Sequence, residues 1–104
     1  GLAEVMAPRL RPFPTGAAAM RALAAAPEPG AIGCTQITEI VETPGLDVAG
    51  PLPPPHALAT LYACAIRAGT AHPEAAARLV ALLSDPATRA LRDGEGFEPP
   101  PDAA

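Results

Sequence analysis

A proline-rich stretch near the middle of the chain constrains its folding more than any other feature. Four of the six residues from Gly50 to Pro55 are prolines, and a proline has no backbone N–H to donate to a helix or a sheet. We therefore expect a stiff, extended connector at residues 51–57. It separates residues 1–50 from residues 58–104, in a chain of 104 residues that is too short for two large independent cores.

Four helices are expected, two on each side of this connector. Their starts carry residues that cap a helix or suit its first turn, such as Thr15 and Pro73, and prolines or glycines lie near their ends. The third is the clearest, because its apolar residues recur at helical spacing. The expected helices cover residues 16–26, 36–41, 73–83 and 86–94.

Short apolar runs between these helices predict strands at residues 10–13, 31–35, 46–49 and 58–66. A helix remains an alternative for the last of them. Alternating strands and helices with short connections predict an α/β fold, with a largely parallel sheet flanked by helices. In such folds ligands bind at the carboxyl edge of the sheet.

The core of this fold is expected to rest on few large side chains. Hydrophobic residues make up 49% of the chain, but much of that share is alanine and only 3% of the residues are aromatic. The side chains expected to form the core are the leucines, isoleucines and valines, together with Phe13, Met20, Tyr62 and Phe97.

Charge excludes two classes of partner. The formal net charge is −4, and the seven basic residues, all arginines, are scattered singly. A surface that binds nucleic acid or an anionic membrane needs clustered positive charge. No apolar run approaches the roughly 20 residues that span a bilayer. The first residues resemble neither a signal peptide nor an initiator sequence, and we expect that the chain is cut from a longer one.

No catalytic or metal-binding set of residues is found. His56 and His72 are expected to be solvated or to cap a helix. Cys34 and Cys64 are expected to be buried free thiols, with a disulfide as the less favoured alternative, and they are too few for a metal site. We therefore expect no enzyme activity, no catalytic residue, no metal and no cofactor.

Two loops are candidates for a ligand site. The first covers residues 13–18, where small side chains would let a ligand approach the N–H groups of a helix start. The alternative is an ordinary N-cap by Thr15, which the sequence favours. The second covers residues 33–39, where Gln36 and Thr38 offer polar groups at another helix start. Its alternative is a variant of the capping box with Thr35 as the N-cap.

The ordered set of these signals resembles molybdate-receptor-type solute-binding proteins of ABC importers, over nearly the whole chain. No single motif is specific, but their order is. The set is Pro14-Thr15-Gly16 with its helix, the segment 30–40, Pro44-Gly45, the segment 50–53, Tyr62, Gly69, the segment 73–76, Asp85-Pro86 and the segment 96–99.

The resemblance implies a partial two-lobed fold of the periplasmic-binding-protein type, with an oxyanion held between helix starts. Residues 1–50 would be part of the second lobe, 51–57 the connector, and 58–104 a crossover strand and the closing helices of the first lobe. Gln36 stands where molybdate receptors often have a tyrosine. The ligand-binding residues carried over from the family are Thr15, Gly16, Ala17, Ala18, Ala19 and Gln36.

The function that the resemblance implies is that of the solute-binding component of an ABC importer. Its partners would be a small oxyanion and the membrane subunits of the importer, its location the periplasm or cell envelope. The alternative is a ligand-sensing domain of a bacterial transcription regulator, because such regulators use the same fold. Apolar faces left without the missing lobe also predict a homodimer of this chain.

Overall fold

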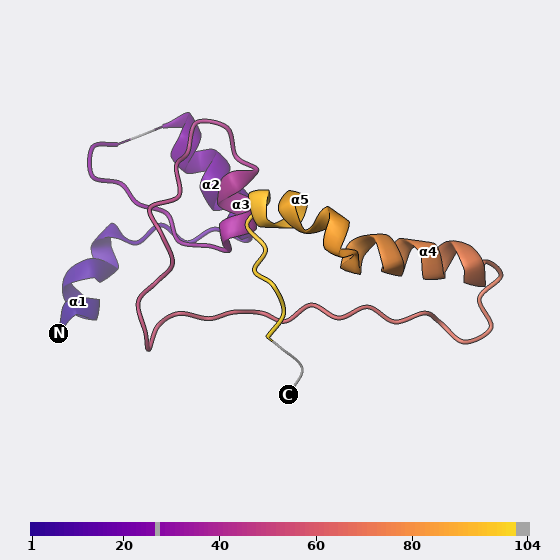
Figure 1. The fold of residues 1–104 in the computed structure, drawn as a ribbon. Coiled ribbons are helices and arrows are strands. Elements are labelled where there is room, and N and C mark those ends of the chain that lie inside the picture. Colours follow the sequence, from indigo (N-terminus) through magenta and orange to yellow (C-terminus); the bar gives the residue numbers. More distant parts are fainter. Residues whose placement is uncertain (27, 102–104) are drawn as a thin grey trace. The chain divides into compact units, whose positions relative to one another are not determined.

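The computed structural model describes residues 1–26 and 28–101 (Figure 1). It divides into two compact units, Gly1–Ala49 and Gly50–Ala104. The division falls at the start of the proline-rich stretch. Each unit is described by itself below.

The first unit is built from short helices. It begins with α1, Leu2–Met6, and the 3-10 helix η1, Ala7–Arg9, neither of which the sequence analysis expected. Two expected helices follow, α2 at Gly16–Ala25 and α3 at Ile37–Val41. The start of α2 is confirmed in detail, because Thr15 is its N-cap and accepts a hydrogen bond from the Ala18 N–H.

The second unit carries the longest helix of the described residues, α4 at Pro73–Ser84. It is followed by the 3-10 helix η2, Pro86–Thr88, and by α5, Arg89–Gly94. Asp85 caps η2 by accepting a hydrogen bond from the Ala87 N–H at 2.8 Å. Both predicted helices of this half are therefore confirmed, including the cap at Asp85.

The predicted parallel sheet is wrong. Residues 1–26 and 28–101 contain helices and irregular segments but no strand. The predicted runs 10–13, 31–35, 46–49 and 58–66 are indeed not helical, and Figure 1 shows the last as a drawn-out stretch. A run becomes a strand only when a neighbour supplies the ladder of hydrogen bonds. No such ladder forms along these four runs within residues 1–26 and 28–101.

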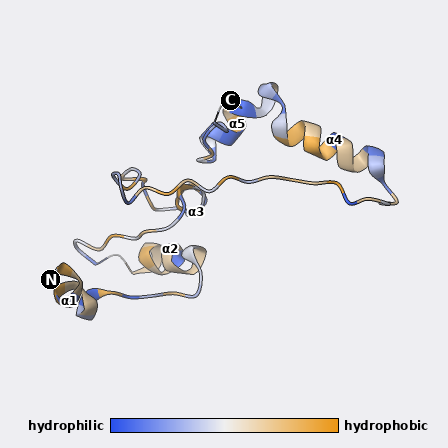
Figure 2. Ribbon diagram, turned by 90° about the horizontal axis from the view of Figure 1, so that it is seen from below, coloured by the Kyte–Doolittle hydropathy of each residue, from blue (hydrophilic) through white to orange (hydrophobic). Residues whose placement is uncertain are grey.

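The predicted core is also wrong in extent. Met20 is 1% exposed, and it is the one buried hydrophobic side chain of the described residues. Phe13, Tyr62 and Phe97 are all exposed by more than two fifths. Figure 2 shows hydrophobic residues along α4 and along the drawn-out stretch before it, where leucines remain in contact with solvent. Helices without a covering layer cannot bury their apolar faces.

Packing in the first unit centres on Met20. A Cβ atom added at Gly33 would overlap the Met20 Cε atom and lie 3.0 Å from the Leu23 Cδ2 atom. Glycine at this position therefore lets the segment before α3 pass directly over α2. Such close approach is one of the uses of a residue without a side chain.

The predictions for the connector and for the two cysteines are each correct only in part. The connector is not extended throughout, because the His56 N–H donates to the Pro53 carbonyl at 2.9 Å and closes a turn. Cys34 and Cys64 are free thiols, but both are exposed and not buried as predicted. No helix within residues 1–26 and 28–101 has the length and apolar character to cross a membrane.

Candidate functional site

The first candidate loop is the start of α2. The hydroxyl of Thr15 accepts the Ala18 N–H at 3.1 Å, and the Thr15 carbonyl accepts the Ala19 N–H at 3.1 Å. The N–H groups of Gly16 and Ala17 belong to the first turn, where a helix offers no internal acceptor. Gly16, Ala17, Ala18 and Ala19 are half-buried and Thr15 is exposed. The ordinary N-cap is therefore present, and two backbone donors of the first turn remain available beside it.

The second candidate loop lies against the first. A Cβ atom added at Gly16 would overlap the Thr35 hydroxyl oxygen and the Glu39 carboxylate. The Thr35 hydroxyl donates a hydrogen bond to that same carboxylate. Helices α2 and α3 also contact each other. The structure thus brings together the start of α2 and the residues that lead into α3.

Gln36 occupies the N-cap position of α3, so the alternative with Thr35 as N-cap is wrong. Its carbonyl accepts the Glu39 and Ile40 N–H groups at 3.1 and 3.4 Å. Its side chain makes no capping hydrogen bond to α3 and is exposed. Gln36 follows Thr35 directly and therefore belongs to the same edge of the unit as the start of α2.

Glu39 brings a negative charge to this edge, although no sequence signal was assigned to it above. Its carboxylate is half-buried at the start of α2, where the helix dipole favours negative charge. The arginines of the first unit lie elsewhere in the sequence, at Arg9, Arg11 and Arg21. Two features of the sequence could have pointed to Glu39. It lies four residues after Thr35, and a glycine, Gly16, stands at the first helical position of α2.

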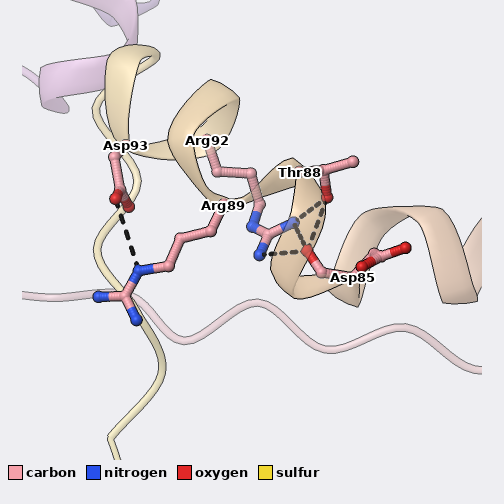
Figure 3. A network of polar contacts seen from close by, with 5 residues as sticks. All are labelled: Asp85, Thr88, Arg89, Arg92 and Asp93. Carbon is pink, nitrogen blue, oxygen red and sulfur yellow. Dashed lines mark hydrogen bonds and ion pairs between the residues drawn. The ribbon is translucent and has the colours of Figure 1, made fainter.

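A second polar cluster ties the end of α4 to α5 (Figure 3). The Arg92 guanidinium donates to the Asp85 carbonyl through both terminal nitrogens at 3.2 Å, and also to the Thr88 hydroxyl. That hydroxyl donates to the carbonyls of Leu82 and Asp85 at 2.8 and 2.9 Å. Arg89 pairs with Asp93 at 3.5 Å. These bonds satisfy carbonyls at a helix end, so we assign the cluster a structural role.

The described residues offer no metal centre, because they contain no cluster of three or more histidine, cysteine or acidic side chains. His72 stands at the N-cap of α4 without a capping bond from its side chain. At this edge the first unit places the backbone N–H groups of Gly16 and Ala17 and the side chain of Gln36 beside the carboxylate of Glu39.

Comparison with known families decides the class of protein. Residues 1–98 match the model of the bacterial extracellular solute-binding proteins. The chain belongs to this family. No curated protein and no solved structure matches it. Membership makes it a solute-binding protein of a transport system, which works outside the cytoplasm with a small ligand and membrane components of a transporter. The prediction of a solute-binding protein is confirmed at this level.

Proposed function

We propose that this solute-binding protein holds a small, molybdate-like oxyanion and delivers it to the membrane subunits of an ABC importer. The observation that carries the proposal is the contact between the start of α2 and Thr35. It puts Thr15, Gly16, Ala17, Ala18 and Ala19 on the same edge as Gln36. Neutral donors at helix starts are a common way to bind an oxyanion without a basic side chain.

We further propose that these residues form one side of a cleft between two lobes. Residues 1–50 would belong to the second lobe, 51–57 would connect, and 58–104 would cross over and close the first lobe. The division of the structure into two units at residues 49 and 50 supports a boundary there. The exposed leucines of the second unit support a further lobe that covers them.

The family favours a receptor over the alternative of a ligand-sensing domain in a transcription regulator, because its members are extracellular. In the 104-residue chain, where that further lobe does not cover them, the same exposed leucines support association with a second copy of this chain.

Weak binding by the 104-residue chain is the first test. If the remaining contacts come from another lobe, calorimetry with molybdate, tungstate or sulfate will show no affinity tighter than about 1 mM, or −4 kcal/mol. Micromolar binding would contradict the proposed lobe boundary.

The position of the site is the second test. Molybdate added to tens of millimolar, followed by amide NMR, will shift Gly16, Ala17 and Gln36. The start of α4 is an internal control, because Glu74 and Ala75 lie in the first turn of a longer helix with no proposed site. Equal shifts at both helix starts would mean that the anion responds only to helix dipoles, and the proposed site would be wrong.

A further inference from the structure

Helix α4 carries an exposed apolar face. Leu82 and Leu83 follow Leu79 at the helical spacings of three and four residues, so the three side chains share one side of the helix. They are 58%, 55% and 58% exposed for Leu82, Leu83 and Leu79. Figure 2 shows hydrophobic residues along this helix. An apolar stripe of this kind is the surface that a partner helix covers.

Two charged residues lie beside this face, one near each end of it. Arg78 precedes Leu79 within α4, and Asp85 directly follows the last residue of the helix. Asp85 keeps a helical φ of −62°. The two residues are seven positions apart, which is about two helical turns, so both lie along the same flank of the leucines. Both are exposed. This flank therefore has a positive end and a negative end.

Two copies of α4 match these charges when the helices run in opposite directions. If the two-fold axis passes between Ala81 and Leu82, Arg78 of each copy lies opposite Asp85 of the other, on the same flank. In a parallel pair in register, Arg78 would face Arg78 and Asp85 would face Asp85, and like charges repel. The antiparallel arrangement also sets the positive end of each helix dipole beside the negative end of the other.

The leucines favour the same axis independently of the charges. The point between Ala81 and Leu82 lies in the middle of the leucine cluster, with Leu79 on one side of it and Leu82 and Leu83 on the other. Leu79 of each copy would then meet Leu82 and Leu83 of the other, across the interaxial distance of about 8–10 Å that packed helices have. One axis satisfies both the apolar and the charged side chains, and this agreement points to a second copy as the occupant of the face.

We propose that α4 pairs with α4 of a second copy in antiparallel orientation, with an Arg78–Asp85 ion pair on each side of the axis. The inference rests on the association of two copies proposed above, and it does not involve the ligand. Asp85 can keep its capping role in the pair. One oxygen of its carboxylate accepts the Ala87 N–H at 2.8 Å, and a carboxylate can accept several hydrogen bonds.

Sedimentation equilibrium tests the face. The unmodified chain should be largely dimeric at about 100 µM, because a small interface of this kind supports affinity in the micromolar range. Leu79→Arg places a charge within the apolar face and should weaken the dimer by at least about tenfold. Ala81→Arg is the matched control, because it places the same charge on the opposite side of α4, and it should leave the dimer unchanged.

Two results would overturn the proposed face. One is a monomeric unmodified chain, which would mean that another part of the same copy covers α4. The other is an equal effect of Leu79→Arg and Ala81→Arg. Circular dichroism of each variant shows that the helix content is retained.

An exchange of charges tests the orientation. Arg78→Glu places a carboxylate opposite Asp85, and Asp85→Lys places an ammonium group opposite Arg78. Each variant alone should therefore dimerise at least about tenfold more weakly than the unmodified chain. An equimolar mixture of the two restores opposite charges at both ends of the pair and should recover most of the lost affinity. Since Asp85→Lys still lacks its cap in the mixture, this recovery cannot come from improved folding.

A second mixture and a control complete the exchange. In a parallel pair, the unmodified chain would rescue Arg78→Glu better than Asp85→Lys does, and in the antiparallel pair the order is reversed. Ala77→Glu carries a carboxylate on the side of α4 opposite the leucines and should dimerise like the unmodified chain. Better rescue by the unmodified chain, or no rescue by either partner, would overturn the proposed pairing. Such a failure would leave the anion-induced NMR shifts at the start of α2 unchanged, so the pairing and the ligand site fail separately.

Discussion

Two glycines, Gly16 and Gly33, allow the close contacts within the first unit. Gly16 and Gly33 lie where a Cβ atom would overlap a neighbour, whereas a Cβ atom at Gly94 would meet nothing within 4 Å. The obstacle at Gly16 includes the Thr35 Cβ atom at 2.8 Å, which moves only with its backbone. The contact between α2 and the segment before α3 therefore depends on the absence of one methyl group at each of two positions.

Gly16→Ala should destabilise the first unit by about 1 to 3 kcal/mol, because the methyl group forces Thr35 and Glu39 away from the start of α2. Urea unfolding followed by circular dichroism measures the loss. Gly94→Ala is the matched control, and it should be neutral or slightly stabilising because alanine favours helix over glycine. Similar losses in both variants would mean that the close contact at Gly16 is unimportant.

Met20→Ala should cost about 2 to 5 kcal/mol, enough to unfold a unit with one buried side chain. The expected result is loss of α2 and α3, seen as lost amide NMR dispersion for residues 16–41. Met6→Ala removes the same side chain from a site that is 37% exposed and should leave those signals in place. Retention of α2 in Met20→Ala would show that the helix does not need this contact.

At the scale of elements, the sequence predicted the features that depend on residues close together in the chain. Thr15 and Asp85 mark helix starts by accepting hydrogen bonds from N–H groups three and two residues further on, and Pro73 marks one through its fixed φ angle. Helices α2, η2 and α4 begin where these residues indicate. Strands depend on distant partners that a single run of residues does not reveal. Residues 31–35 look like a buried parallel strand, yet they pass over α2 as an irregular segment because Gly33 fits against Met20.

The same difference between local and distant interactions applies to the candidate site. The N-cap at Thr15 was readable from sequence, and the helix predicted from Gln36 begins one residue later, at Ile37. The carboxylate of Glu39 was not, because its place beside Gly16 depends on the packing of α2 against α3. Whether the six proposed residues bind a ligand remains a prediction.

The junction of α4 and α5 allows a test with two arginines on one short helix. Arg92→Met removes charge-assisted bonds to the Asp85 carbonyl and the Thr88 hydroxyl, and should cost about 1 kcal/mol after allowance for its partial exposure. Arg89→Met removes only an exposed ion pair with Asp93 and should cost less than about 0.5 kcal/mol. Helicity at 222 nm as a function of temperature compares the two. Equal losses would contradict the structural role given to Arg92.

At the scale of the whole molecule, exposed apolar surface is the dominant property, and it predicts that stability depends on concentration. If two copies associate through the exposed leucines of α4, raising the concentration a hundredfold adds about 2.7 kcal/mol to the folded state by mass action. The thermal midpoint should therefore rise between 10 µM and 1 mM. Leu79→Arg, which places a charge on that exposed face, should show a flat midpoint over the same range, and a flat midpoint in the unmodified chain would argue against assembly.

Because Met20 is buried and Met6 is partly exposed, the oxidation rates of these two methionines report how often the first unit opens. A thioether is oxidised to the sulfoxide only when peroxide reaches it, and Met20 is 1% exposed whereas Met6 is 37% exposed. Under dilute hydrogen peroxide Met6 should react at the rate of a free methionine, and Met20 only during moments when the first unit opens. The ratio of the two rates, read by mass spectrometry from one sample, then gives the fraction of time that the first unit spends open. Once oxidised, Met20 carries a polar oxygen that its site cannot solvate. The first unit therefore stays open after any opening during which Met20 is oxidised.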